Sequence, residues 1–255
     1  MSAVQNLTLE HTVSVDAPVF SATRTRILYA VTFIAIISFI MALYFSLVYT
    51  PTDIDQGNVQ RLFYTHISTF SGAFCAFLAT VFGGILYLIT KNSKWDTLAL
   101  AGVETGFVLA AINLITGSIW ARPIWNTWWT WDPRLTSAAI MLLTYAAYFM
   151  LRSGIENVDT KRRFASVYGI LAFSTVLVTL FIIRLRPDTI HPTVIGESPQ
   201  NAQGGFSMDT SMITALGVVM TVWCVFIPIA MMWWRIRLEA VAEFVRAKRA
   251  QVVEG

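Results

Sequence analysis

Two histidines and a group of tryptophans are the residues of this chain whose types could carry chemistry. Five of the nine tryptophans fall within twelve positions, at Trp120, Trp125, Trp128, Trp129 and Trp131. His66 and His191 are two of only three histidines, and the third, His11, lies in a polar N-terminal segment. Neutral imidazole nitrogens bind haem iron axially, and aromatic side chains pack on the faces of a porphyrin. If the fold gathers these residues, they could form a haem site.

The elements that must position these residues are membrane helices. The 255-residue chain is 56% hydrophobic and only 13% charged, whereas about a quarter of the residues of a soluble domain are charged. Runs of about 20 apolar residues span a bilayer core. Six such runs occur, at Ile27–Tyr49, Ile67–Thr90, Thr97–Ile119, Leu135–Leu151 (which begins at Pro133), Phe164–Ile183 and Thr210–Trp234. We therefore expect an all-α integral membrane protein built as a six-transmembrane-helix bundle.

The chain divides into three parts on this interpretation. Residues 1–23 are polar and lack the regions that mark a signal peptide, so we expect a mobile cytoplasmic tail. Residues 24–235 form the six-span membrane domain, with the tryptophan segment at 120–137. Residues 236–255 place Leu238, Val241 and Val245 on one helical face, which predicts a cytoplasmic amphipathic tail.

The distribution of lysine and arginine predicts how the bundle is oriented, because loops on the cytoplasmic side carry an excess of these residues. With the N-terminus inside, 13 of the 18 lysines and arginines lie on the inner side. Both termini are then inside, and His66, His191 and the tryptophan segment share the extracytoplasmic face of the inner membrane. The net charge of +3 reflects this anchoring in the bilayer, and nucleic acid is not expected as a partner.

Each candidate residue also has a simpler interpretation. Trp125, Trp128 and Trp129 have the spacing i, i+3, i+4, so in a helix they would share one face and could anchor it at the membrane surface. Asp132 and Pro133 are a favourable N-cap and first residue for the fourth span. A histidine on the outer face is usually a surface group. A structural zinc ion is a weaker alternative, because it would need about four ligands and no thiolate is available on the outer face.

Charged groups supply further candidates. Five arginines are expected on the outer face, at Arg61, Arg122, Arg134, Arg184 and Arg186. Arginine pairs well with carboxylates such as haem propionates, but it also anchors helices by snorkelling. Glu104 and Asn113 lie within the third span, where a polar group either makes a structural contact or helps to move a ligand. Cys75 and Cys224 lie in apolar spans without a Cys-x-x-Cys-His motif, so we expect no thioether attachment of haem.

These residues together resemble the WWD-motif family of haem-handling proteins in cytochrome c assembly. Residues 125–137 read WNTWWTWDPRLTS, and residues 116–123 (TGSIWARP), 56–57 (QG) and 61–66 (RLFYTH) fit the same family. His191-Pro192 falls where the family has its second outer histidine. With six spans and two outer histidines, the chain is most similar to the CcmC type of haem exporter protein. Asn126 stands where the motif usually has glycine, and Asn tolerates a positive φ better than most residues.

The resemblance implies a protein that presents haem and makes no bonds of its own. Haem b would be held transiently and non-covalently at the outer face, with His66 and His191 as axial ligands of the iron. The tryptophans, Asp132, Arg61, Arg122 and Arg134 would surround it. The expected partners are haem, a membrane-anchored haem chaperone (CcmE type), ATP-binding cassette subunits and the lipid bilayer. Two other classes stay open: a component of a cytochrome c haem lyase or synthetase, and a haem transporter with a polar path through the bundle.

Overall fold

The computed structural model describes residues 21–186, 188–191 and 208–254, and its elements are helical. The order is α1 (Ala22–Tyr44), α2 (Leu62–Thr90), α3 (Ser93–Trp125), α4 (Pro133–Gly154), α5 (Val158–Leu185), α6 (Thr210–Thr221) and α7 (Ile227–Glu254). Single π-helical turns extend α1 over Phe45–Tyr49 and join α6 to α7 over Val222–Phe226. A short 3-10 turn over Asn58–Arg61 leads into α2. The first 20 residues of the predicted cytoplasmic tail lie outside the described residues.

Six of these helical stretches are long and apolar enough to cross a membrane, which confirms the predicted six-span architecture. The helices extend beyond the apolar runs at most ends. The third span, for example, covers Ser93–Trp125, and the last is continuous over Thr210–Gln251. Polar residues at helix ends remain helical because long charged side chains can reach the membrane surface. Residues 236–254 are consequently a helical continuation of the last span.

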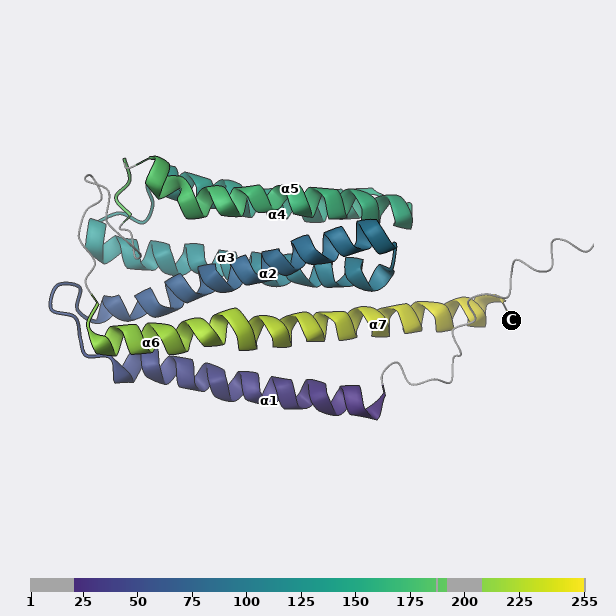
Figure 1. Cartoon of the computed structure of the whole chain (residues 1–255), viewed down its shortest axis with the longest axis horizontal. Helices are drawn as coiled ribbons and strands as arrows, with labels where there is room; N and C mark the ends of the chain where they lie inside the picture. The colour runs from purple at the N-terminus through teal and green to yellow at the C-terminus, as the bar shows by residue number, and fades with distance from the viewer. Residues whose placement is uncertain (1–20, 187, 192–207, 255) are drawn as a thin grey trace, which may run out of the picture.

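The helices lie side by side in three layers (Figure 1). One outer layer holds α4 and α5, the middle layer holds α2 and α3, and the continuous α6–α7 helix lies on the other side, with α1 beyond it. The closest pair is α2 with α3, and small residues make this approach possible. A Cβ atom at Gly102 of α3 would lie 2.6 Å from the Ala76 carbonyl oxygen of α2. Close backbone approach at small residues is the usual way that membrane helices associate.

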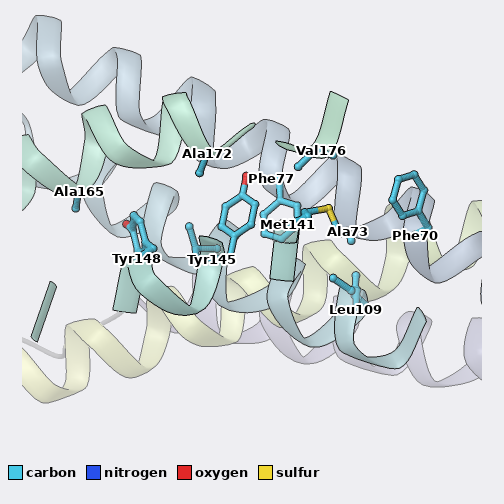
Figure 2. Packing of buried hydrophobic residues seen from close by; sticks show 12 residues of the cluster. Phe70, Ala73, Phe77, Leu109, Met141, Tyr145, Tyr148, Ala165, Ala172 and Val176 are labelled. Carbon is cyan, nitrogen blue, oxygen red and sulfur yellow. The ribbon is translucent and has the colours of Figure 1, made fainter. Parts of the chain in front are cut away.

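A large hydrophobic cluster forms the core between the middle layer and the α4–α5 layer (Figure 2). Phe77 of α2 and Tyr145 of α4 stack with ring centroids 3.6 Å apart and planes 9° from parallel. Tyr148, one turn further along α4, is also fully buried. This core holds α4 against α2, so it fixes the start of α4 relative to the start of α2.

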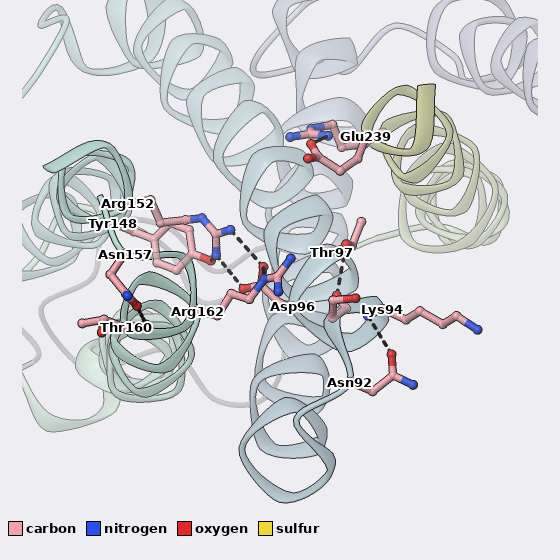
Figure 3. Close-up of polar contacts among 12 residues, drawn as sticks. Asn92, Lys94, Asp96, Thr97, Tyr148, Arg152, Asn157, Thr160, Arg162 and Glu239 are labelled. Carbon is pink, nitrogen blue, oxygen red and sulfur yellow. Dashed lines mark hydrogen bonds and ion pairs between the residues drawn. The ribbon is translucent and has the colours of Figure 1, made fainter. Parts of the chain in front are cut away.

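The two ends of the bundle differ in character. At the end where α2 joins α3 and α4 joins α5, an ionic cluster links three helices (Figure 3). Asp96 of α3 accepts two hydrogen bonds from Arg152 of α4, at 2.7 and 3.0 Å, and lies 3.5 Å from Arg162 of α5. The start of α1 and the C-terminal end of α7 lie at this same end (Figure 1). The opposite end carries the longer connections, including the tryptophan segment.

Candidate functional site

His66 lies in the second turn of α2 and is held by Asn113 of α3. The Nδ1 atom of His66 is 2.9 Å from the Asn113 carbonyl oxygen, and the Asn113 side-chain amide donates to the His66 carbonyl oxygen at 2.7 Å. With the proton on Nδ1, His66 donates to this carbonyl oxygen and Nε2 keeps its lone pair; with the proton on Nε2, Nδ1 accepts from the Asn113 side-chain amide, 3.1 Å away. Metal-binding histidines usually take the first arrangement, with the second ring nitrogen donating to a carbonyl or carboxylate.

Gly117 of α3 makes room for the His66 ring. A Cβ atom added to Gly117 would lie 2.7 Å from Cε1 of His66, closer than real side chains approach. The ring therefore occupies the space that any larger residue would fill. Gly117 lies just before the tryptophan segment in the sequence, but its contact with His66 depends on how α2 crosses α3 and was not predicted.

Four aromatic rings form a closed circuit that contains both predicted histidine ligands. The ring centroids are 5.8 Å apart for His66 and Trp120, 6.2 Å for Trp120 and Trp125, and 6.4 Å for Trp125 and His191. The circuit closes between His191 and His66, at 6.1 Å with the ring planes 39° apart. Both histidines are buried, with exposed fractions of 8% and 7%. Residues from three separate parts of the chain thus meet at one point.

Two cavities adjoin this pair of imidazoles. The cavity on the tryptophan side is narrow, with a volume of about 40 Å³. The cavity on the other side, a crevice between α5 and α6, has a volume of about 370 Å³. Five residues line both: His66, Phe70, Asn113, Arg134 and His191. The two histidines consequently stand at the junction of the two cavities.

The tryptophan segment does not form the helical face that its spacing suggests. The helix α3 ends at Trp125, and Asn126 follows in the left-handed region with φ 54°, as expected of an Asn replacing glycine. Residues 126–132 are not helical, so Trp128 and Trp129 lie beyond the helix that ends at Trp125, and the three tryptophans do not share a helical face. All three nevertheless line the narrow cavity, together with Trp120. Trp131 is not among the lining residues and is 76% exposed.

Of the polar candidates, one arginine lines both cavities, and the others make hydrogen bonds to the backbone. Arg134 lines both cavities, and its guanidinium carbon lies 5.4 Å from the centre of the Phe70 ring. Arg122 instead donates to the Asn126 carbonyl oxygen at 2.8 Å, and Arg61 donates to a carbonyl oxygen at the end of the first span, at 2.5 Å. Asp132 caps α4, because it accepts from the backbone N–H of Leu135 at 2.9 Å.

A hydrogen bond that was not predicted ties the site to the first outer connection. The indole nitrogen of Trp120 donates to the Gln56 side-chain oxygen at 3.0 Å. Gln56 belongs to a turn in which the Asp53 carboxylate accepts the backbone N–H of Gln56 at 2.7 Å, and Gly57 takes a positive φ of 60°. Gln56 and Gly57, the Gln-Gly pair of the motif, therefore hold the indole N–H of Trp120 in place.

Glu104, the carboxylate within the third span, lies away from this site. Its carboxylate pairs with Arg235 of α7, which also pairs with Glu239 at 2.9 Å. These contacts tie α3 to α7 and agree with the structural interpretation of Glu104. Asn113, the other polar residue of that span, is instead part of the His66 site.

Comparison with known proteins gives one family. The profile of the family described as "CcmC: Heme exporter protein C" matches residues 12–251. The chain is 31% identical to the heme exporter protein C of Paracoccus denitrificans over 56% of this chain and 59% of that protein. It is 32% identical to the protein of that name from Rhodobacter capsulatus over 60% of this chain and 62% of that protein. It is 31% identical to a putative cytochrome c biosynthesis ccmC-like mitochondrial protein of Marchantia polymorpha over 70% of this chain and 73% of that protein. The alignments with the two bacterial proteins thus cover about three fifths of those relatives.

Proposed function

This chain belongs to the heme exporter protein C family, and from that premise we propose that it binds haem at the outer membrane face and presents it to a haem chaperone during cytochrome c maturation. Haem b is the cargo, held transiently and without a covalent bond. His66 and His191 bind the iron from its two sides. The outer face is the extracytoplasmic side of the inner membrane, in line with the uneven distribution of lysine and arginine.

The observation that carries this proposal is the spacing of the two buried imidazoles. Their ring centroids are 6.1 Å apart. A metal bound by one nitrogen of each ring at about 2 Å, the usual metal–imidazole distance, would separate the centroids by about 6 Å. With its proton on Nδ1, which is 2.9 Å from the Asn113 carbonyl oxygen, His66 would present Nε2 as the ligand atom. Aromatic rings on the same circuit suit the apolar faces of a porphyrin.

Arg134 is the cation best placed to pair with a propionate of haem. It lines both cavities beside the histidines, and among the described residues no ion pair engages it. Arginine binds carboxylates in a fork geometry, which would orient the porphyrin as well as hold it. Arg61 and Arg122 are engaged by backbone carbonyl groups, so they rank behind Arg134.

The handover needs a partner that reaches the outer end of the bundle. Trp128 and Trp131 are 58% and 76% exposed there, and exposed aromatic side chains favour protein contacts. A membrane-anchored haem chaperone would dock at this end, and ATP-binding cassette subunits would drive its release. The protein itself then acts as a carrier. The transporter alternative gains nothing from Glu104 and Asn113, since both make structural contacts.

Maturation of c-type cytochromes in a bacterium that lacks its own family member tests this function. His66→Ala and His191→Ala should each abolish maturation, because each removes one ligand of the iron. His11→Ala is the matched control and should support normal maturation, since His11 lies in the N-terminal segment. Normal maturation with both His66→Ala and His191→Ala would refute the assignment.

A further inference from the structure

The two cavities beside the histidines offer two ways to reach them, and they differ greatly in size. The tryptophan side, at about 40 Å³, holds little more than one water molecule. The crevice between α5 and α6, at about 370 Å³, falls in the range of small-molecule sites. The crevice therefore has room for a bulky ligand, and the narrow cavity does not.

The crevice exists because α5 and α6 both pack against α2 and hardly touch each other. Figure 1 shows α5 in one outer layer and α6 in the other, with α2 in the layer between them. Ile67 and Ser71 of α2 form part of the crevice floor. Its apolar walls come from both neighbouring helices, through Leu180 and Phe181 of α5 and Leu216 and Met220 of α6.

The position of these side chains along the helices places the opening in lipid. Phe181, which is 54% exposed, lies four residues before the end of α5, and Met220 lies ten residues after the start of α6. At 1.5 Å per residue, the crevice lining runs from the helix ends, at Arg184 and Met208, to about 15 Å inside them, at Met220. The hydrocarbon core is about 30 Å thick, so the inner part of the crevice lies at the depth of one leaflet.

The charges in the crevice fit a flat apolar ligand that carries carboxylates. Arg134 of α4 and Arg184 of α5 both line it, together with the two histidines. Haem has an apolar macrocycle and two propionates at one edge, so it matches both the walls and the cations. A phospholipid tail would use the apolar walls alone.

We infer that haem reaches the histidines sideways from the outer leaflet, through the crevice between α5 and α6. This inference rests on the proposed function and adds the route and the source of the cargo. Leu216, Met220 and Phe181 line the passage and set the rate of loading. The tryptophan side remains for contact with the protein that receives haem.

Loading kinetics test the route. Haem-free protein in liposomes is mixed with phosphatidylcholine vesicles that contain haemin, and the Soret band is followed with time. Leu216→Trp fills the passage and should slow loading several-fold, because the larger ring narrows the crevice. Phe181→Ala widens the passage and should accelerate loading. Ile213→Trp is the matched control, because it lies one turn from Leu216 on the same helix, is 56% exposed and does not line the crevice.

The outcomes separate the route from the function. Wild-type loading rates in Leu216→Trp, with full final haem content, would overturn the route and leave a crevice filled by lipid tails. No haem uptake by the wild-type protein would overturn the proposed function and the route with it. If Leu216→Trp elutes as aggregate in size-exclusion chromatography, Met220→Trp replaces it, with the same expected slowing. Equal slowing in Ile213→Trp would also contradict the route.

Discussion

At the scale of single residues, the site depends on how the His66 ring is held. Asn113 contacts its Nδ1 atom through the backbone carbonyl and the side-chain amide, and Gly117 leaves the space in which the ring lies. The sequence could predict that His66 and His191 lie close together, because each adjoins a span end on the same predicted side, and their ring centroids are 6.1 Å apart. It could not predict Gly117 or Asn113 as supports, since their roles arise only from the crossing of α2 and α3.

Gly117→Ala tests this support. The added methyl group would meet Cε1 of His66 at 2.7 Å, so the ring must turn or move, at a cost of about 1–3 kcal/mol for overpacking. We expect haem affinity to fall about tenfold, since 1.4 kcal/mol corresponds to a factor of ten. Haem titration followed at the Soret band measures it. Gly154→Ala is the control, because a Cβ there meets nothing within 4 Å. Unchanged affinity in Gly117→Ala would show that the ring is free to adjust.

The tryptophans, which the sequence presents as one group, should differ in their effects. Trp125 belongs to the aromatic circuit with His191, whereas Trp131 is largely exposed. Trp125→Ala should therefore lower haem affinity strongly, and Trp131→Ala should change it by less than about 0.5 kcal/mol, as for most surface substitutions. The same haem titration decides between them. Equal losses in both variants would mean that the exposed tryptophan also contacts the porphyrin.

At the scale of elements, hydropathy was sufficient to predict the six spans but not their ends. Helices such as α3 continue past the apolar run to Trp125, because the backbone hydrogen bonds of a helix do not depend on apolar side chains. The spacing of the tryptophans would give a shared face only if the segment were helical, and the structure ends α3 at Trp125, with Asn126 as its C-cap. Local turn chemistry at one residue thus overrode the periodicity. The Asp132–Pro133 helix start, in contrast, could be predicted from the residues alone and is confirmed.

The ionic cluster at the opposite end should stabilise the bundle without affecting the haem site. Asp96 is 5% exposed and joins α3 to Arg152 of α4 and Arg162 of α5. Asp96→Asn leaves a partly buried guanidinium without its carboxylate, and removing one partner of a buried pair costs about 3–5 kcal/mol. We expect a lower Tm in detergent with unchanged haem affinity. Lys94→Gln, on the same helix and exposed, is the control. A wild-type Tm in Asp96→Asn would show that the cluster is not a stabilising contact.

At the scale of the whole molecule, the two ends of the bundle differ in composition. One end brings His66 and His191 together with Trp120, Trp125, Trp128 and Trp129, and the other carries the ionic cluster around Asp96 (Figure 3) and the C-terminal end of α7 (Figure 1). The positive-inside distribution predicts that the ionic end faces the cytoplasm. Neither the helix pattern nor the packing alone defines which end faces the cytoplasm, because turning the whole bundle over in the membrane changes neither of them.

Reporter fusions test this orientation. Green fluorescent protein fused after Gly255 should fluoresce, because it folds in the cytoplasm, and alkaline phosphatase fused after Trp131 should be active, because it requires the extracytoplasmic side. Fusion of the phosphatase after Gly154, at the opposite end of α4, is the matched control and should be inactive. The reverse pattern would put the histidine site on the cytoplasmic side.

The most direct test of the central claim is the visible absorption spectrum of the purified protein with haem. A site in which His66 and His191 both bind the iron predicts a sharp low-spin spectrum for the wild-type protein and for His11→Ala. His66→Ala and His191→Ala should each weaken the Soret band or shift it to a high-spin form. A low-spin spectrum that survives in both variants, or no Soret band in the wild type after haem is added, would contradict axial binding by this pair of histidines.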